Sequence, residues 1–189
     1  MLLALSLLAC AGPTRPAVAP ATRALIEQAE QRERARRYDQ ARALYREAEA
    51  SAPDPASRTW AARRFAHALL FWGEEAEAET ELAALVARDP TDVASWHDLG
   101  IVRHRRGDRA GAERALRRAV ALAPREPRPR IALAALLVVD RRWRDALAEY
   151  RALLDLDLPE RTRRAVGRGI ELVEAELRAA PRGRAILSP

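Results

Sequence analysis

Residues 93–126 read VASWHDLGIVRHRRGDRAGAERALRRAVALAPRE and predict two helices joined by a short turn. Apolar and small residues recur there at helical spacing, as in a helix that buries one face. Pro124 is placed to stop the second helix, because proline lacks the N–H that the next turn needs. The residues that carry the pattern are Trp96, Leu99, Gly100, Gly107, Ala112, Leu116, Ala119 and Pro124.

The same pattern returns in neighbouring segments when the frame moves by 34 residues. The units are 22–55, 59–92, 93–126 and 127–160, with Ala56-Ser57-Arg58 as an insertion after the first. This arrangement resembles the tetratricopeptide repeat, a helix–turn–helix unit of 34 residues. The resemblance implies an all-α fold, a right-handed α-solenoid of about four hairpins. Small residues at positions 8 and 20, such as Gly100 and Ala112, are expected where the two helices of a hairpin approach each other.

Residues 161–180 predict one more amphipathic helix after the last unit. Val166, Ile170, Val173 and Leu177 share one face, with Arg and Glu residues opposite. A terminal unit of a solenoid needs a polar outer face, so this segment is expected to be a capping helix. Residues 181–189 are expected to form a tail.

The N-terminal segment predicts a lipid anchor. Residues 1–9 are apolar, and Leu7-Leu8-Ala9-Cys10 resembles the lipobox of bacterial lipoproteins. The resemblance implies cleavage before Cys10 and acylation of its thiol. Residues 10–21 then form a Pro- and Ala-rich linker between the lipid and the helices. Ala11, rather than Asp, follows the cysteine, which favours the periplasmic face of the outer membrane.

Composition excludes several function classes. All 33 basic residues among the 189 are Arg, so no Lys is present for a Schiff base or a phosphate-binding loop. A single Cys excludes a disulfide framework, and no catalytic motif appears, so we predict no enzyme, no cofactor and no metal site. The net charge of +6 divides by unit, with −4 in residues 59–92 and +4 in residues 93–126. This contrast favours salt bridges between units over a nucleic-acid track.

The repeat resemblance also implies where a ligand binds, because the first helix of each hairpin lines the concave side of such a solenoid. Aromatic, aliphatic and cationic side chains at these positions suit an extended or helical peptide with acidic character. For Trp60 and Phe71, packing between units is the alternative. The predicted groove residues are Trp60, Arg63, His67, Phe71, His97, Ile101, His104, Arg105, Arg128 and Ile131.

A carboxylate clamp of the kind found in some cochaperone repeats is matched only in part. Asp98 and Ala132 stand at two of its positions, and Asp98 would repel a ligand carboxylate. We therefore predict a non-enzymatic scaffold that binds or helps to assemble another envelope protein. The alternative is a soluble cytoplasmic repeat adaptor or cochaperone whose N-terminus is wrongly assigned.

Overall fold

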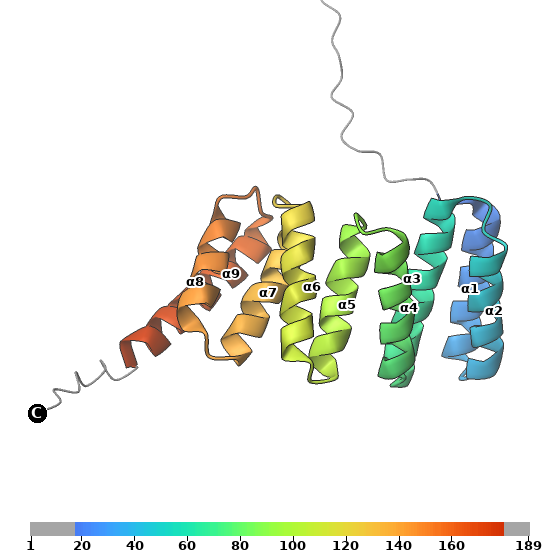
Figure 1. Cartoon of the computed structure of the whole chain (residues 1–189), viewed down its shortest axis with the longest axis horizontal. Coiled ribbons are helices and arrows are strands. Elements are labelled where there is room, and N and C mark those ends of the chain that lie inside the picture. Colours follow the sequence, from blue (N-terminus) through green and yellow to red (C-terminus); the bar gives the residue numbers. More distant parts are fainter. Residues whose placement is uncertain (1–17, 180–189) are drawn as a thin grey trace, which may run out of the picture. The chain divides into compact units, whose positions relative to one another are not determined.

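The structure is a computed structural model that describes residues 18–179. Every regular element in that range is an α-helix, which confirms the all-α prediction there. The predicted signal segment, Cys10 and the tail 181–189 lie outside the described residues. Figure 1 shows the helices in chain order. They are α1 (Pro20–Arg34), α2 (Tyr38–Ala50), α3 (Pro55–Trp72), α4 (Glu75–Arg88), α5 (Val93–Arg105), α6 (Arg109–Leu122), α7 (Pro127–Val139), α8 (Trp143–Leu154) and α9 (Glu160–Ala179).

The helices form successive hairpins, as the repeat predicts. Helix α1 packs on α2, α5 on α6, and α7 on α8, and α9 closes the series against α8. The chain divides into two compact units, with the boundary between Phe65 and Ala66 inside α3.

The turn inside each hairpin repeats the same backbone conformation. Arg36, Gly73, Gly107 and Arg141 all have positive φ, at 57°, 84°, 85° and 57°. The N–H of each bonds to the carbonyl three residues back, and the next N–H bonds to the carbonyl five residues before it. These two bonds are the Schellman arrangement, which ends a helix through one left-handed residue. The 34-residue register therefore holds in the backbone, with Ala56-Ser57-Arg58 accounting for the longer first interval.

Aspartate side chains begin several of the helices. Asp54, Asp92 and Asp108 each accept a hydrogen bond from a backbone N–H in the first turn that follows, which satisfies a donor that the helix itself leaves free. At Asp54, hydrogen bonds from the Ser57 side chain and backbone lower the pKa of the carboxyl group. The three-residue insertion thus forms the start of α3, which has 18 residues where α5 and α7 have 13.

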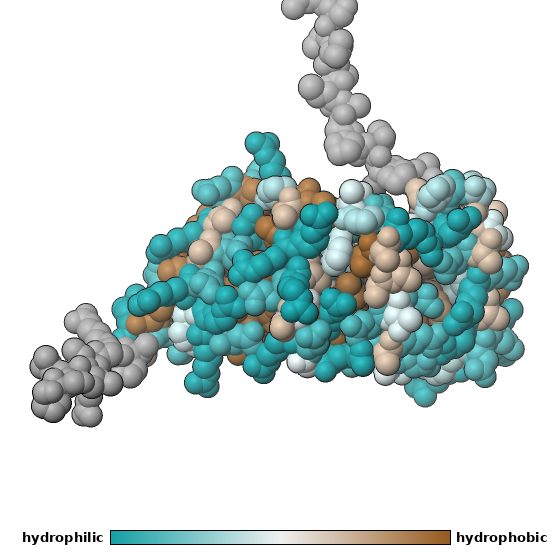
Figure 2. All heavy atoms as spheres, viewed as in Figure 1, coloured by the Kyte–Doolittle hydropathy of each residue, from teal (hydrophilic) through white to brown (hydrophobic). Residues whose placement is uncertain are grey.

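The interior of each unit is built from small and aliphatic residues. In the first unit, the rings of Tyr45 and Phe65 stack with centroids 5.6 Å apart. In the second, a β-carbon on Gly100 would lie 2.6 Å from Cγ of Leu116, so α5 and α6 approach as closely as predicted. Figure 2 shows hydrophilic side chains over most of the visible face. Between residues 18 and 179, no helix is both long and apolar enough to span a membrane.

The capping helix packs as its apolar face predicts. Val173 belongs to the buried cluster that contains Leu116, Leu133 and Leu137, and Leu177 packs against that cluster. Val166 is buried in a second cluster with residues of α8 and the following loop, and Ile170 packs against it. Helix α9 therefore covers an apolar surface that would otherwise face solvent at this end of the second unit.

Candidate functional site

A small apolar hollow opens between α5 and α7, with α6 behind it; we call it the α5–α7 hollow. Its volume is about 120 Å³. Ala132 and Ala135 of α7 contribute only methyl groups to its wall, and Ile101 of α5 contributes a larger aliphatic side chain. Its lining residues are Ile101, His104, Leu116, Ala132, Ala135, Leu136 and Val139. Because His104 is the one polar lining residue, the hollow favours an apolar ligand group.

One face of α7 leads into this hollow. Ala132, Ala135 and Val139 line it at intervals of three and four residues, which places them on one side of the helix. Arg128 precedes Ala132 by four residues and therefore lies on the same face, one turn before the hollow. Arg128 is exposed and forms no ion pair with residues 18–179. A cation thus stands beside an apolar opening.

Two histidines, His67 of α3 and His97 of α5, contact the buried carboxylate of Asp98 on α5. Nε2 of His67 lies 2.9 Å from Oδ2 of Asp98, and Nδ1 of His97 lies 3.0 Å from its Oδ1. The Asp98 residue is only 7% exposed. Because both carboxylate oxygens are engaged from within the second unit, Asp98 does not present a free anion to a ligand. The His67 side chain is still 43% exposed, whereas that of His97 is 15% exposed.

The C-terminal end of α5 is held by a different set of contacts. Nε of Arg105 donates to Glu75 over 2.9 Å, and its guanidinium also reaches the carbonyl oxygen of Leu70 at 3.5 Å. The next residue after Leu70, Phe71, is 74% exposed. Arg105 therefore lies near an uncovered aromatic residue, and its charge is partly balanced by Glu75.

The remaining predicted groove residues lie elsewhere. Trp60 and Arg63 belong to the first unit, where both are half-buried and Arg63 makes further polar or electrostatic contacts. Ile131 packs against the buried cluster of Leu153, Leu158 and Val166 rather than lining the hollow. The second unit thus brings Ile101 and His104 together at the hollow. Arg128 follows on the same face of α7, and His67 and His97 meet at Asp98.

Several lining residues were missing from the predicted groove set. Leu116 comes from the second helix of its hairpin, and repeat register assigns second helices to the core. Ala132, Ala135, Leu136 and Val139 carry no polar group that would single them out in sequence. They are recognised only in the folded chain, where small residues of α7 and the larger Ile101 of α5 line the same hollow. Among residues 18–179, no three His, Cys, Asp or Glu side chains gather as metal ligands do.

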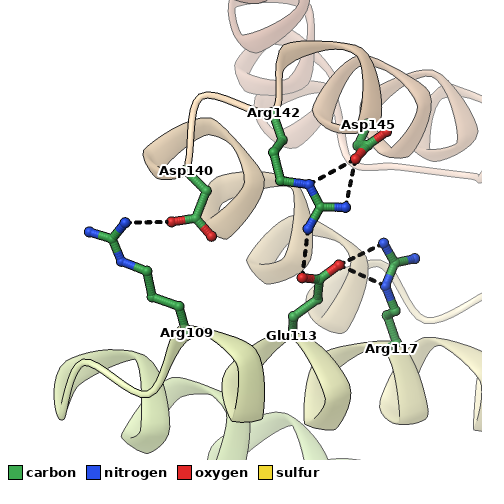
Figure 3. Close-up of polar contacts among 6 residues, drawn as sticks. All are labelled: Arg109, Glu113, Arg117, Asp140, Arg142 and Asp145. Carbon is green, nitrogen blue, oxygen red and sulfur yellow. Dashed lines mark hydrogen bonds and ion pairs between the residues drawn. The ribbon is translucent and has the colours of Figure 1, made fainter.

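Ion pairs join neighbouring hairpins in the second unit, as the opposed charges of residues 59–92 and 93–126 predict. Glu79 of α4 pairs with Arg103, at 3.0 Å, and with Arg106. On the next hairpin, Glu113 of α6 accepts from Arg117 of its own helix and, at 2.6 Å, from Arg142 at the start of α8 (Figure 3). These pairs hold the turns of one hairpin against the second helix of the preceding one.

The same network shifts the titration of its carboxylate. Burial alone would raise the pKa of Glu113, but hydrogen bonds from Arg117 and Arg142 outweigh it, and the pKa lies below its ordinary value. Bonds to Asp145 and Glu113 raise the pKa of Arg142. Arg109 pairs with Asp140 at 2.9 Å beside this cluster (Figure 3). The turn between α7 and α8 is therefore fixed to α6 by charge on both sides.

Comparison with known proteins finds a repeat-family match over part of the chain. The sequence model of a tetratricopeptide repeat family matches residues 33–100. A comparison with curated proteins finds no match. The matched segment runs from the end of α1 into α5, and hence across two of the hairpin turns described above.

Solved structures share the fold at low sequence identity. The crystal structure of MamA is 16% identical, with 82% of this chain and 81% of that chain covered at a TM-score of 0.65. The type III secretion chaperone SycD of Yersinia enterocolitica, in complex with a peptide of the translocator YopD, is 18% identical. That match covers 61% of this chain and 92% of SycD at a TM-score of 0.57. A tetratricopeptide repeat protein of Parabacteroides merdae is 11% identical, with 84% and 62% covered at a TM-score of 0.66. The helical hairpins described here therefore have the tetratricopeptide fold.

Proposed function

We propose that this chain, whose hairpins have the tetratricopeptide fold, is a non-enzymatic scaffold that binds an acidic peptide segment of a partner protein. The observation that carries the proposal is the α5–α7 hollow with Arg128 one turn away on the same helix face, where it forms no ion pair with residues 18–179. An apolar pocket gives contact area, and a nearby cation selects a carboxylate. The peptide bound to SycD, a protein of the same fold, supports this mode of use.

The pairing of Asp98 supports an acidic partner. A free carboxylate on this face would repel acidic residues, but His67 and His97 hydrogen-bond both of its oxygens. Arg128 then supplies positive charge one helical turn from the hollow, whereas Arg105 at the end of α5 is ion-paired with Glu75. The local balance thus favours anionic residues in the ligand.

Selection from a phage-displayed library of random twelve-residue peptides tests the proposal. We expect the wild-type chain to enrich peptides rich in Asp and Glu, and their affinity to fall as salt rises. Arg128→Glu is expected to weaken the best synthetic peptide at least threefold at low salt, in fluorescence anisotropy. Arg144→Glu on α8 is the control, because Arg144 is also exposed and forms no ion pair with residues 18–179. Failure to enrich any peptide would contradict the proposal.

We propose further that Cys10 anchors this scaffold in the bacterial envelope, at the periplasmic face of the outer membrane, where it binds or helps to assemble another envelope protein. The support is the segment Leu7-Leu8-Ala9-Cys10, its apolar precursor and the linker that follows. Acyl chains on the cysteine would hold the helices near the bilayer surface. A soluble cytoplasmic adaptor or cochaperone is the competing function, favoured by the repeat alone.

Metabolic labelling separates these two functions. Cells that express the full chain are given radiolabelled palmitate, and the protein is then isolated. We expect label on the wild-type chain and none on Cys10→Ser, with the wild type in the membrane fraction. An unlabelled wild type would favour the soluble adaptor and leave peptide binding untouched.

A further inference from the structure

The α5–α7 hollow has the size and lining of a pocket for one side chain. Its volume is about 120 Å³. An apolar protein cavity of about 150 Å³ accepts benzene, so this one suits a branched aliphatic side chain better than an indole ring. Six of the seven lining residues carry only carbon on their side chains, which disfavours a charged guest.

The position of Arg128 adds a second contact at a defined distance. Arg128 precedes Ala135, one of the lining residues, by seven residues on α7, or about 10 Å along the axis. An extended peptide advances about 3.3 Å per residue, so three residues cover that distance. A ligand that runs along α7 therefore brings a carboxylate to Arg128 when its acidic residue lies two to four positions from the apolar one.

We propose that the α5–α7 hollow takes one Leu, Ile or Val side chain of the partner segment, and that Arg128 pairs with an Asp or Glu two to four residues away in that segment. This inference rests on the proposed function and adds to it the spacing that the peptide must have. It also assigns the ligand face to α5 and α7 of the second unit, with Leu116 of α6 as the back wall.

The test uses the best synthetic peptide selected on the wild-type chain, with affinity measured by fluorescence anisotropy. We expect an aliphatic residue in the peptide whose replacement by Ala weakens binding at least tenfold. Ala135→Leu fills the hollow and is expected to weaken binding by a similar factor. Ala148→Leu on α8 is the control, because Ala148 is also exposed but does not line the hollow.

A complementary variant keeps the test valid if Ala135→Leu perturbs folding. Ile101→Ala enlarges the hollow, so selection on that variant is expected to shift the apolar position toward Phe or Met. For the charge, moving the acidic residue along the peptide is expected to weaken binding at least threefold outside the two-to-four window on the wild type. The same move should have no effect on Arg128→Glu.

The results distinguish failure of the pocket or of the Arg128 pairing from failure of the proposed peptide binding itself. Peptides that bind but are insensitive to both Ala135→Leu and Ile101→Ala would overturn the pocket and leave peptide binding standing. Peptides sensitive to the pocket variants but indifferent to acidic spacing would overturn the Arg128 pairing. If no peptide binds the wild-type chain, the proposed function itself fails.

Discussion

Helices α5 and α7 hold the same place in successive hairpins and carry different side chains at equivalent positions. Both have 13 residues, and each is followed by a left-handed turn residue 34 positions from the other. On α5, polar side chains at these positions bond within the second unit. On α7, the matching side chains are apolar. The equivalent pairs are His97 and Ile131, Asp98 and Ala132, and Arg105 and Val139.

This difference shows that the repeat determines the positions of the helices, whereas the individual side chains determine which contacts form on them. The repeat sets the helix positions, so both faces point the same way by register. Asp98 and Arg105 form hydrogen bonds to residues of the second unit. Ala132 and Val139, in contrast, line the open α5–α7 hollow. An open apolar hollow therefore arises where the chain places side chains too small to fill the space between α5 and α7.

Making α5 resemble α7 at its polar centre is expected to have the largest effect. Asp98→Ala removes the acceptor of His67 and His97, and the Nδ1 of His97, whose side chain is only 15% exposed, loses its hydrogen bond to the carboxylate. Hydrogen bonds to a charged group contribute about 1.5–3 kcal/mol, so we expect a loss of about 2 kcal/mol in the free energy of unfolding. Urea denaturation followed by circular dichroism measures it.

The control for Asp98→Ala is Asp157→Ala. Asp157 is exposed and forms no ion pair with residues 18–179, so this change should stay within about 0.5 kcal/mol of wild type. Equal stability of the two variants would show that the histidine contacts do not stabilise α5.

Position 8 of the repeat gives the next largest contrast, since α5 has Gly100 where α7 has Ala134. A methyl group on Gly100 would meet Leu116 at 2.6 Å. Overpacking costs about 1–3 kcal/mol, and the gain in helix propensity offsets about 1 kcal/mol of it. We expect Gly100→Ala to lower the free energy of unfolding by about 1 kcal/mol.

The same Gly→Ala substitution at Gly167 of α9 is expected to raise stability instead of lowering it. No heavy atom lies within 4 Å of a β-carbon built there. Gly167→Ala should therefore raise stability by up to about 1 kcal/mol through helix propensity alone. If Gly100→Ala also stabilises the chain, the close approach of α5 and α6 imposes no size limit at that position.

Sequence register predicted the hairpins well because backbone features recur with it. The turn residues Gly73, Gly107 and Arg141 are spaced by 34, and the apolar face of α9 packs as its spacing indicated. Side-chain pairing was harder to predict. The contact of His67 with Asp98 joins residues 31 apart on two helices, and no local pattern records such a distance. The register also placed Ile131 in the groove, although it packs in the cluster that α9 helps to cover.

The ion pairs that fix the α7–α8 turn are expected to contribute less and to depend on pH. Glu113→Gln removes the charge that Arg117 and Arg142 share, with an expected loss of about 1 kcal/mol at pH 7. Because folding lowers the pKa of Glu113, its contribution is present above the unfolded value of about 4.3 and is lost as pH falls through the folded value. The difference between wild type and variant should shrink at pH 3.

Urea denaturation at pH 7 and pH 3 gives this comparison directly. Glu171→Gln is the control, because Glu171 is exposed on α9 and forms no ion pair with residues 18–179. A Glu113→Gln difference that stays constant from pH 7 to pH 3 would mean that the carboxylate charge does not stabilise the turn.

The turns that follow α5 and α7 are expected to show the smallest difference in stability, because their backbones have the same conformation. Gly107 follows α5 and Arg141 follows α7, both with positive φ and the same pair of backbone bonds. A residue with a β-carbon pays about 1 kcal/mol to adopt the left-handed conformation. Glycine avoids that cost, but it also stabilises the unfolded chain through its greater conformational entropy, so the net gain is smaller. Arg141→Gly should therefore raise the free energy of unfolding by about 0.5 kcal/mol, and Gly107→Arg should lower it by a similar amount. Thermal and urea unfolding of both variants measure the pair, and a loss of stability in Arg141→Gly would mean that the Arg141 side chain, rather than the backbone alone, holds the turn.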